Sequence, residues 1–233
     1  MNYPIALITG ASRGLGRALA AGLAREGYSL ILAARDGTAL AKTAAGLGTN
    51  RVTTIAGDVT DPAHRAALRD AVAARGGLDL LINNAGTLGA HPLPALADYP
   101  IDELRAAFEV NVLAPLALTQ LLLPALREPG GAILNVTSDA AVEAYSGWGG
   151  YGAAKAALEQ VSNVLAAEES TVRVWWVDPG DLRTDMHQQA FPGEDISDRP
   201  LPAAVVPGFV RLISERLPSG RYRAADLAPL VTS

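Results

Sequence analysis

Cysteine is absent from this chain of 233 residues, and aromatic and charged side chains are few, at 5% and 18%. The lack of cysteine excludes disulfide bonds, thiolate metal ligands and cysteine nucleophiles. Hydrophobic residues make up 49% of the chain, a share that is too high for a disordered protein and sufficient for a large core. The length suits one α/β domain over residues 1–233.

Basic tracts and long apolar runs are missing as well. The net charge of −5 and the absence of a basic stretch argue against a nucleic-acid partner. No uninterrupted apolar run reaches about 18 residues, the length that a membrane span needs, and residues 1–4 do not resemble the start of a signal peptide. We therefore expect a cytoplasmic protein with no nucleic-acid and no membrane partner.

Lysine is rare, because only Lys42 and Lys155 stand among the 19 basic residues. Lys155 follows Tyr151 by four residues, and on a helix this spacing puts both side chains on one face. An ammonium beside a phenol lowers the tyrosine pKa from about 10, which would suit Tyr151 to alcohol and carbonyl chemistry. A solvated helix face would show the same spacing, so the motif needs support from the rest of the chain.

Short apolar runs alternate with longer helical patterns, which predicts βαβ units and a parallel sheet with helices on both faces. We expect strands over residues 5–8, 30–34, 52–56, 78–82, 132–136, 172–177 and 221–223. We expect helices over residues 13–27, 103–127 and 151–167, with a bend or break at Pro115. The fold class is thus a doubly wound (Rossmann) sheet of about seven strands in a single domain.

Residues 181–207 show no regular pattern and are rich in proline and acidic side chains. A long irregular segment inside a compact domain is usually a functional lid or a mobile loop. We therefore expect residues 181–207 to form a lid over the substrate.

A glycine-rich loop, residues 9–16, joins the first predicted strand to the first predicted helix. Gly10 lets the backbone turn, Gly14 allows a diphosphate to approach, and Gly16 lets the helix pack on the strand. The helix N-terminus adds N–H donors and a positive dipole end. No Gly-Lys-Ser/Thr follows, which excludes a P-loop nucleotidase. The loop predicts a dinucleotide site made by Gly10, Ser12, Arg13, Gly14, Leu15 and Gly16.

With four further motifs, this glycine spacing resembles the short-chain dehydrogenase/reductase family. Asn83-Asn84-Ala85-Gly86 follows the fourth predicted strand, Ser138 follows the fifth, and Pro179-Gly180 follows the sixth. Tyr151 and Lys155 stand between the last two, and Tyr151 comes thirteen residues after Ser138, the separation usual in the family. The resemblance covers residues 5–185 and implies a nicotinamide-dependent oxidoreductase.

The end of the second strand distinguishes NADP from NAD in such folds. An acidic residue there binds the 2′-hydroxyl of NAD, whereas an arginine accommodates the 2′-phosphate of NADP. Here Arg35 follows the strand, and Arg13 would bring a second cation, although Asp36 could instead reach the ribose. The sequence favours NADP(H) over NAD(H).

The resemblance implies further cofactor contacts. Residues after the third and fourth strands would contact the adenosine, namely Asp58, Val59, Asn84, Ala85 and Gly86. Residues after the sixth strand would hold the nicotinamide carboxamide and the adjoining phosphate, namely Pro179, Gly180 and Thr184.

The resemblance also implies a catalytic centre. Tyr151 would be the acid in reduction and the base in oxidation, while Lys155 would lower its pKa and bind the nicotinamide ribose. Ser138 would position the substrate oxygen, with Thr137 as an alternative hydroxyl. Asn111 matches the helix asparagine that anchors a water next to the lysine. The predicted catalytic residues are Ser138, Tyr151, Lys155 and Asn111.

The three histidines, His64, His91 and His187, do not cluster in the sequence, so each is expected at the surface and no metal site is predicted. Substrate contacts would come from residues 87–96, 140–150 and 185–201, and Trp148 would offer an aromatic wall. The sequence does not identify the small-molecule substrate itself.

These features predict an NADP(H)-dependent reductase of ketones or aldehydes, reversible as an alcohol dehydrogenase. The alternative is an NADP-binding sensor or scaffold protein with little turnover. Epimerases and dehydratases that share Tyr-x-x-x-Lys usually carry a larger carboxyl-terminal domain. The family's Gly-Gly extension is missing, whereas apolar helix faces remain near 103–127 and 153–167, so we expect a homodimer over a tetramer.

Overall fold

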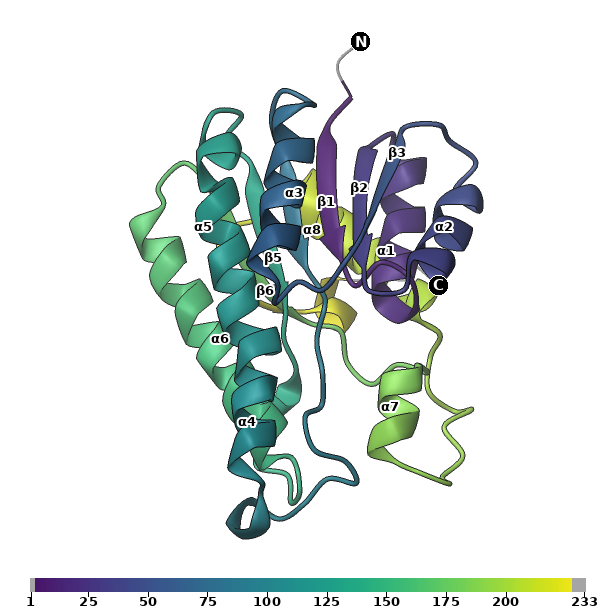
Figure 1. Ribbon diagram of the computed structural model, residues 1–233, viewed down its shortest axis with the longest axis vertical. Coiled ribbons are helices and arrows are strands. Elements are labelled where there is room, and N and C mark those ends of the chain that lie inside the picture. Colours follow the sequence, from purple (N-terminus) through teal and green to yellow (C-terminus); the bar gives the residue numbers. More distant parts are fainter. Residues whose placement is uncertain (1–2, 228–233) are drawn as a thin grey trace.

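Seven parallel strands form one sheet in the order β3-β2-β1-β4-β5-β6-β7 (Figure 1). The structure, a computed structural model, describes residues 3–227. The strands are β1 (Ile5–Thr9), β2 (Ser29–Ala34), β3 (Val52–Ala56), β4 (Leu80–Asn83), β5 (Ala132–Val136), β6 (Arg173–Asp178) and β7 (Gly220–Arg223). The strand order reverses direction between β1 and β4, and such a switch point places a ligand crevice at the carboxyl ends of the strands.

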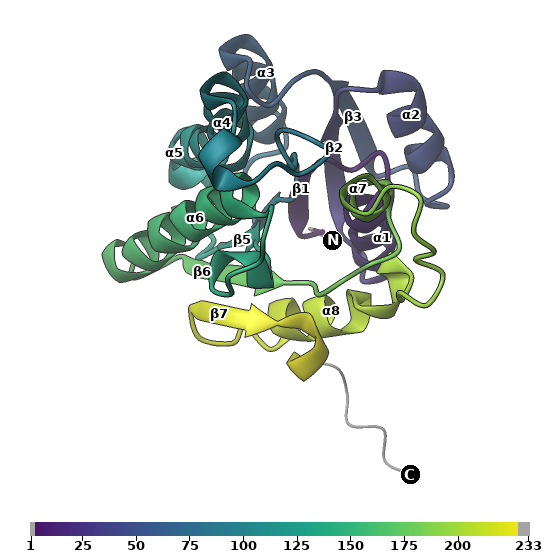
Figure 2. The same ribbon diagram turned by 90° about the horizontal axis from the view of Figure 1, so that it is seen from below.

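Helices cover both faces of the sheet (Figure 2). One face carries α1 (Gly14–Arg25), α2 (Gly37–Ala45) and α8 (Val206–Ser214). The other carries α3 (Pro62–Ala73), α4 (Ile101–Phe108), α5 (Ala114–Arg127) and α6 (Gly149–Glu168). A short helix, α7 (Asp185–Ala190), lies beyond the carboxyl ends of the strands, near the start of α1.

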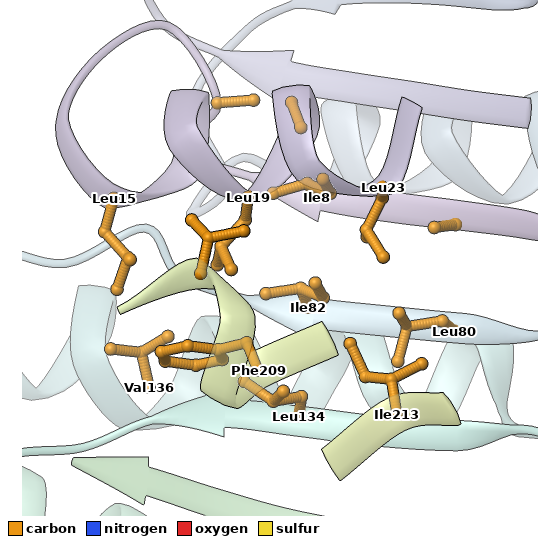
Figure 3. Packing of buried hydrophobic residues seen from close by; sticks show 14 of the residues in the cluster. Ile8, Leu15, Leu19, Leu23, Leu80, Ile82, Leu134, Val136, Phe209 and Ile213 are labelled. Carbon is orange, nitrogen blue, oxygen red and sulfur yellow. The ribbon is translucent and has the colours of Figure 1, made fainter. Parts of the chain in front are cut away.

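Alternate strand residues pack into two separate hydrophobic cores, one on each face, because successive side chains point to opposite faces of a sheet. Ile8 of β1 packs with Leu19 of α1 and Phe209 of α8 (Figure 3), whereas the preceding Leu7 packs with Leu118 of α5 on the other face. This burial on both faces explains the continuous apolar runs of the central strands.

The seven predicted strands are all confirmed, with boundaries that differ by two residues at most. The helix predicted over residues 103–127 is confirmed together with its expected irregularity near Pro115, since a π-helical segment, Glu109–Leu113, lies between α4 and α5. Pro115 explains the break, because it has no N–H for the carbonyl of Asn111 and its ring would clash with that carbonyl. By length and composition alone, the stretch Ile101–Arg127 could cross a membrane, but its inner residues are buried on the sheet, as in a core helix.

Residues 181–207 are less irregular than predicted, because they contain α7, a short 3-10 helix (Pro202–Ala204) and the first two residues of α8. Thr184 caps α7 by accepting a hydrogen bond from the His187 N–H at 3.2 Å. Parts of the expectations for residues 1–4 and for the carboxyl-terminal tail fall on residues 1–2 and 228–233, outside the described residues.

Candidate active site

The glycine loop between β1 and α1 has the backbone that a diphosphate site needs. Gly10 and Gly14 have φ of 65° and 53°, left-handed values that are strained for residues with a Cβ. A Cβ on Gly10 would lie 2.8 Å from Nδ2 of Asn84, and one on Gly16 would collide with the Gly10 carbonyl. The backbone N–H groups at the start of α1 therefore stay accessible to an anion. Ser12 anchors the loop by accepting from Thr43 Oγ1 at 3.1 Å, and Leu15 is buried in the core.

Asn84 ties this loop to strand β4. Its Nδ2 donates to the carbonyls of Thr9 and Gly10 at 2.9 and 3.2 Å. The backbone N–H groups of Asn84 and Ala85 both donate to Thr9 Oγ1 at 3.0 Å. Thr9 is thus a functional residue that the sequence analysis missed, although its place at the end of β1 was a usable signal.

Charged groups gather where β2 and β3 end. Burial alone would raise the pKa of Asp58, but hydrogen bonds from Thr60, with the charges of Arg35 and His64, lower it overall. Asp58 therefore remains a carboxylate beside the neighbouring Val59, whose carbonyl accepts from Arg65 at 2.7 Å. Asp36, the expected competitor for the ribose, instead caps α2 by accepting from Ala39 N at 2.9 Å. Arg35 is exposed.

Arg13 and Thr184 connect the glycine loop to α7. The Arg13 guanidinium pairs with Asp185 at 3.2 Å, and both side chains are more than half exposed. A Cβ on Gly14 would lie 3.6 Å from the Thr184 side chain. The segment after β6 thus approaches the phosphate loop. This segment begins with Pro179 and Gly180, and the Gly180 N–H donates to the Asp178 carboxylate at 2.8 Å.

Tyr151 and Ser138 meet at the carboxyl end of β5. Tyr151 is 9% exposed, and burial raises the pKa of its phenol well above 10, with the charges of Asp178 and Asp139 adding to the rise. A hydrogen bond with Ser138 opposes this rise. The prediction that Lys155 lowers this pKa is wrong for this structure, because desolvation and two carboxylates raise it and only the hydrogen bond of Ser138 lowers it. The phenol therefore holds its proton at neutral pH.

Lys155 lies one helical turn from Tyr151, as the spacing predicts. Its ammonium is 5.5 Å from the centre of the Tyr151 ring and donates to the Val136 carbonyl at 2.8 Å. Burial lowers the pKa of Lys155 to about 8. An ammonium has three protons, so two remain for other acceptors. A Cβ on Gly86 would lie only 3.0 Å from Asn111 Oδ1, a tight contact, and 3.7 Å from the Lys155 ammonium, an ordinary one.

Asn111 is fully buried in the π-helical segment. Its side chain binds both polar groups of one residue, since Nδ2 donates to the Thr87 carbonyl at 2.8 Å and Oδ1 accepts from the Thr87 N–H at 3.0 Å. Because Pro115 cannot donate to the Asn111 carbonyl, that carbonyl lacks its usual helical partner. Asn111 therefore holds the loop after β4 with its side chain.

Ser138 has a carboxylate partner that the sequence analysis did not weigh. Its hydroxyl donates to Asp139 Oδ1 at 2.9 Å, and Tyr145 donates to Oδ2 of the same side chain at 3.0 Å. Thr137, the alternative hydroxyl, is 2% exposed and donates to Glu159 at 2.8 Å. Ser138 is consequently the hydroxyl beside Tyr151, and Thr137 is committed elsewhere.

Known proteins share this arrangement. The short chain dehydrogenase family matches residues 4–195. The chain belongs to this family. A sepiapterin reductase of Meriones unguiculatus is 39% identical over 205 residues, covering 82% of this chain and 78% of the relative. An uncharacterized oxidoreductase of Escherichia coli, YciK, is 32% identical over 224 residues, covering 92% and 88%.

A solved structure shows the same fold with a nucleotide bound. The short chain dehydrogenase from Shigella flexneri complexed with NADP superposes with a TM-score of 0.90 at 30% identity, covering 97% of this chain and 98% of that one. This protein is therefore a short-chain dehydrogenase/reductase, an enzyme whose fold binds a nicotinamide cofactor.

The residues of this short-chain dehydrogenase fit that cofactor. The glycine loop supplies a cradle that a Cβ would fill, and the Lys155 ammonium keeps two protons for ribose hydroxyls. Asn84 and Ala85 fix the loop, while Thr184 lies opposite Gly14. Within residues 3–227, no group of three or more His, Asp and Glu side chains could hold a metal ion.

Two of the three histidines in this short-chain dehydrogenase are not surface residues, which corrects the prediction. His64 and His187 are 7% and 9% exposed, whereas His91 is exposed. Burial lowers the pKa of His64, so its ring stays neutral. His187 packs against Phe191, with ring centres 4.9 Å apart. Tertiary packing decided both positions, and neither has a signal in the local sequence.

Proposed function

We propose that this short-chain dehydrogenase reduces a ketone or aldehyde with NADPH and, in reverse, oxidises the corresponding alcohol. The observation that carries the proposal is the buried, protonated phenol of Tyr151 beside Ser138. Reduction requires a proton donor at the carbonyl oxygen, whereas oxidation requires a phenolate. The raised pKa of Tyr151 therefore favours reduction near neutral pH.

Each residue of the centre has a distinct task in this proposal. Tyr151 gives its proton to the carbonyl oxygen, and Ser138 orients that oxygen by hydrogen bonding. Lys155 holds the ribose of the cofactor through its free N–H groups. A bound reduced nicotinamide supplies the hydride that adds to the carbonyl carbon.

NADP(H) is the proposed cofactor in preference to NAD(H). Arg35 is exposed at the end of β2, where a 2′-phosphate would lie. The carboxylate of the nearby Asp36 accepts the capping hydrogen bond of α2, so it does not offer the ribose contact typical of NAD. The Shigella flexneri relative is complexed with NADP.

Apolar and aromatic side chains next to Tyr151 favour a substrate with a planar or hydrophobic body. The Trp148 ring lies edge-on to Tyr151 with centres 5.7 Å apart, and Phe191 lies 5.9 Å from Trp148. Leu93 and Met186 pack against the same group. The segment 181–207 would thereby act as a lid, and pterin-like carbonyls are good candidates because one relative is a sepiapterin reductase.

The proposal also places the enzyme in the cytoplasm as a homodimer. Exposed apolar residues on the outer helices support the assembly, namely Ile101, Leu113, Leu121 and Val164.

NADPH consumption with aldehydes, ketones, quinones and pterin-like carbonyls tests the activity. The wild type should turn over at least one class, and NADH in place of NADPH should be a poorer reductant. Tyr151→Phe should lose about 100-fold or more in kcat while its NADPH Kd, measured by fluorescence, stays the same. Tyr222→Phe is the matched control, because the Tyr222 phenol on β7 donates to the carbonyl of Pro218, which precedes that strand.

Tight NADPH binding without turnover of any carbonyl would contradict the reductase. Equal rates with NADH and NADPH would contradict the cofactor preference alone.

A further inference from the structure

An arginine from the last strand reaches the catalytic serine. Arg221 lies on β7, paired in register with Trp176 of β6. Because side chains alternate along a strand, Arg221 points away from Tyr222, which packs against the core of α1 and α8. Its guanidinium therefore lies on the α6 face of the sheet, where it donates a hydrogen bond to Glu159 of α6.

The guanidinium makes three directed contacts there. Its Nε lies 2.9 and 3.2 Å from the two carboxylate oxygens of Glu159. Its Nη2 donates to the main-chain carbonyl of Ser138 at 3.2 Å and lies 3.9 Å from Asp178. The side chains of Arg221 and Glu159 are only 27% and 12% exposed, so water screens this pair little.

Glu159 holds the residue before Ser138. Its Oε1 accepts from Thr137 Oγ1 at 2.8 Å. The ion pair thus fixes two consecutive residues of the turn after β5, Thr137 through its side chain and Ser138 through its carbonyl. The hydroxyl of Ser138 donates to Asp139 Oδ1 at 2.9 Å and is close enough to Tyr151 to lower the pKa of that phenol by hydrogen bonding.

We propose that Arg221 is a positioning residue for the reaction: with Glu159, it holds the turn 137–139 so that the Ser138 hydroxyl faces the substrate oxygen and Tyr151. The rigid fork of an arginine can bind Glu159 and the Ser138 carbonyl together, whereas the point charge of a lysine cannot do so with the same geometry. The proposal rests on the proposed reductase activity for its kinetic test only.

The kinetic test compares Arg221→Met and Arg221→Lys with Arg223→Met. Arg223 is the matched control, because it lies on the same face of β7 and 3.9 Å from Asp178, but is 64% exposed. Both Arg221 variants should lose about tenfold or more in kcat, with unchanged NADPH Kd and with Arg223→Met at the wild-type rate. Wild-type kcat in Arg221→Lys would overturn the proposal, since a merely electrostatic role would survive that change.

A double-mutant cycle tests whether the pair acts as a unit. Glu159→Gln keeps an acceptor for Thr137 but removes the charge. If the two residues work together, Glu159→Gln combined with Arg221→Met should be about as slow as Arg221→Met alone. Fully additive losses would overturn the joint role.

Amide hydrogen exchange supplies a readout that does not depend on turnover. Peptides covering residues 132–148 should exchange faster in Arg221→Met than in Arg223→Met, at equal global stability, because the turn loses its anchor. Equal exchange in both variants would overturn the proposal. If the wild type turned over no carbonyl, the reductase would fail while this measurement still decided the role of Arg221.

Discussion

Two carboxylates, Asp139 and Asp178, share the surroundings of Tyr151, and both raise the pKa of its phenol. Asp178 is buried, and its own pKa is raised by that burial, although Arg221 and Arg223 oppose the rise. Asp139 is bound to Ser138 and to the Ala140 N–H. At the scale of single residues, the site thus keeps Tyr151 protonated first by burying the phenol and then by placing two carboxylates near it.

Asp139→Asn should shift the pH profiles of both reduction and oxidation to lower pH. The change keeps one oxygen that can accept from Ser138 and from the Ala140 N–H, loses the acceptor for Tyr145, and removes a charge that raises the pKa of Tyr151. Reduction needs the phenol, so its rate should begin to fall at a lower pH than in the wild type; oxidation needs the phenolate and should begin at a lower pH. Profiles of kcat against pH in both directions measure this, with the exposed Asp198→Asn as control. An upward shift would contradict the electrostatic account.

Lys155→Met should stabilise the fold while abolishing turnover. Burial lowers the pKa of Lys155 from 10.5 to about 8, so at pH 7 folding must bury a charged ammonium. Removing it should add about 1–2 kcal/mol to the free energy of unfolding. The unfolded state binds more protons than the folded state between pH 8 and 10.5, so this gain should shrink as pH rises through that window.

Urea unfolding at pH 7 and pH 9.5 measures the effect of Lys155→Met. The exposed Lys42→Met provides the control, since it is the other lysine in the chain. A destabilised Lys155→Met at pH 7 would show that the hydrogen bond to the Val136 carbonyl outweighs the desolvation of the ammonium.

At the scale of elements, the break between α4 and α5 serves the site. The π-helical segment Glu109–Leu113 places Asn111 against Thr87 and leaves its carbonyl without the partner that Pro115 cannot supply. The regular α-helix is therefore interrupted next to the proposed active site. Irregular turns of this kind are frequent at functional sites.

Pro115→Ala should restore an N–H at position 115 and favour a continuous α-helix. The Asn111 side chain would then leave Thr87, and kcat should fall about tenfold with little loss of thermal stability. Pro124→Ala is the matched control, because Pro124 lies inside α5 away from the site and should leave kcat unchanged. Equal kcat in both variants would show that the break does not position Asn111.

At the scale of the whole molecule, the seven-stranded sheet brings residues from its strands and their loops together at the carboxyl ends of the strands. Thr9, Ser138 and Arg221 are far apart in sequence, yet they lie at or near the carboxyl ends of β1, β5 and β7. The outer helices carry the exposed Leu121 of α5 and Val164 of α6, which offer an apolar face for a second copy.

We expect sedimentation to give a homodimer. Leu121→Glu combined with Val164→Glu should convert it to a monomer, because charges would be buried at the interface. Leu201→Glu is the control, since Leu201 is also exposed and apolar but lies beyond the strand ends. A stable tetramer of the wild type would contradict the expectation.

Local patterns were sufficient for much of the fold and for the choice of the proposed catalytic residues. Strands such as 52–56 and 132–136 have the predicted bounds, because short runs rich in β-branched and apolar residues next to glycine are strong local signals. The break at Glu109–Leu113 was hinted at by Pro115, but the sequence does not say on which side of a proline the helix adjusts. The burial of His64 and His187 had no local signal, since their neighbours in space come from other elements.

The sequence by itself determined the family, the parallel sheet and the residues Ser138, Tyr151 and Lys155, because these depend on spacing along one strand, loop or helix. Only the tertiary structure decided the protonation of Tyr151 and the partners of Ser138. The reason is physical: a pKa depends on burial and on charges such as Asp178, and the Arg221–Glu159 pair joins residues 62 positions apart. Such contacts exist only once the sheet has assembled.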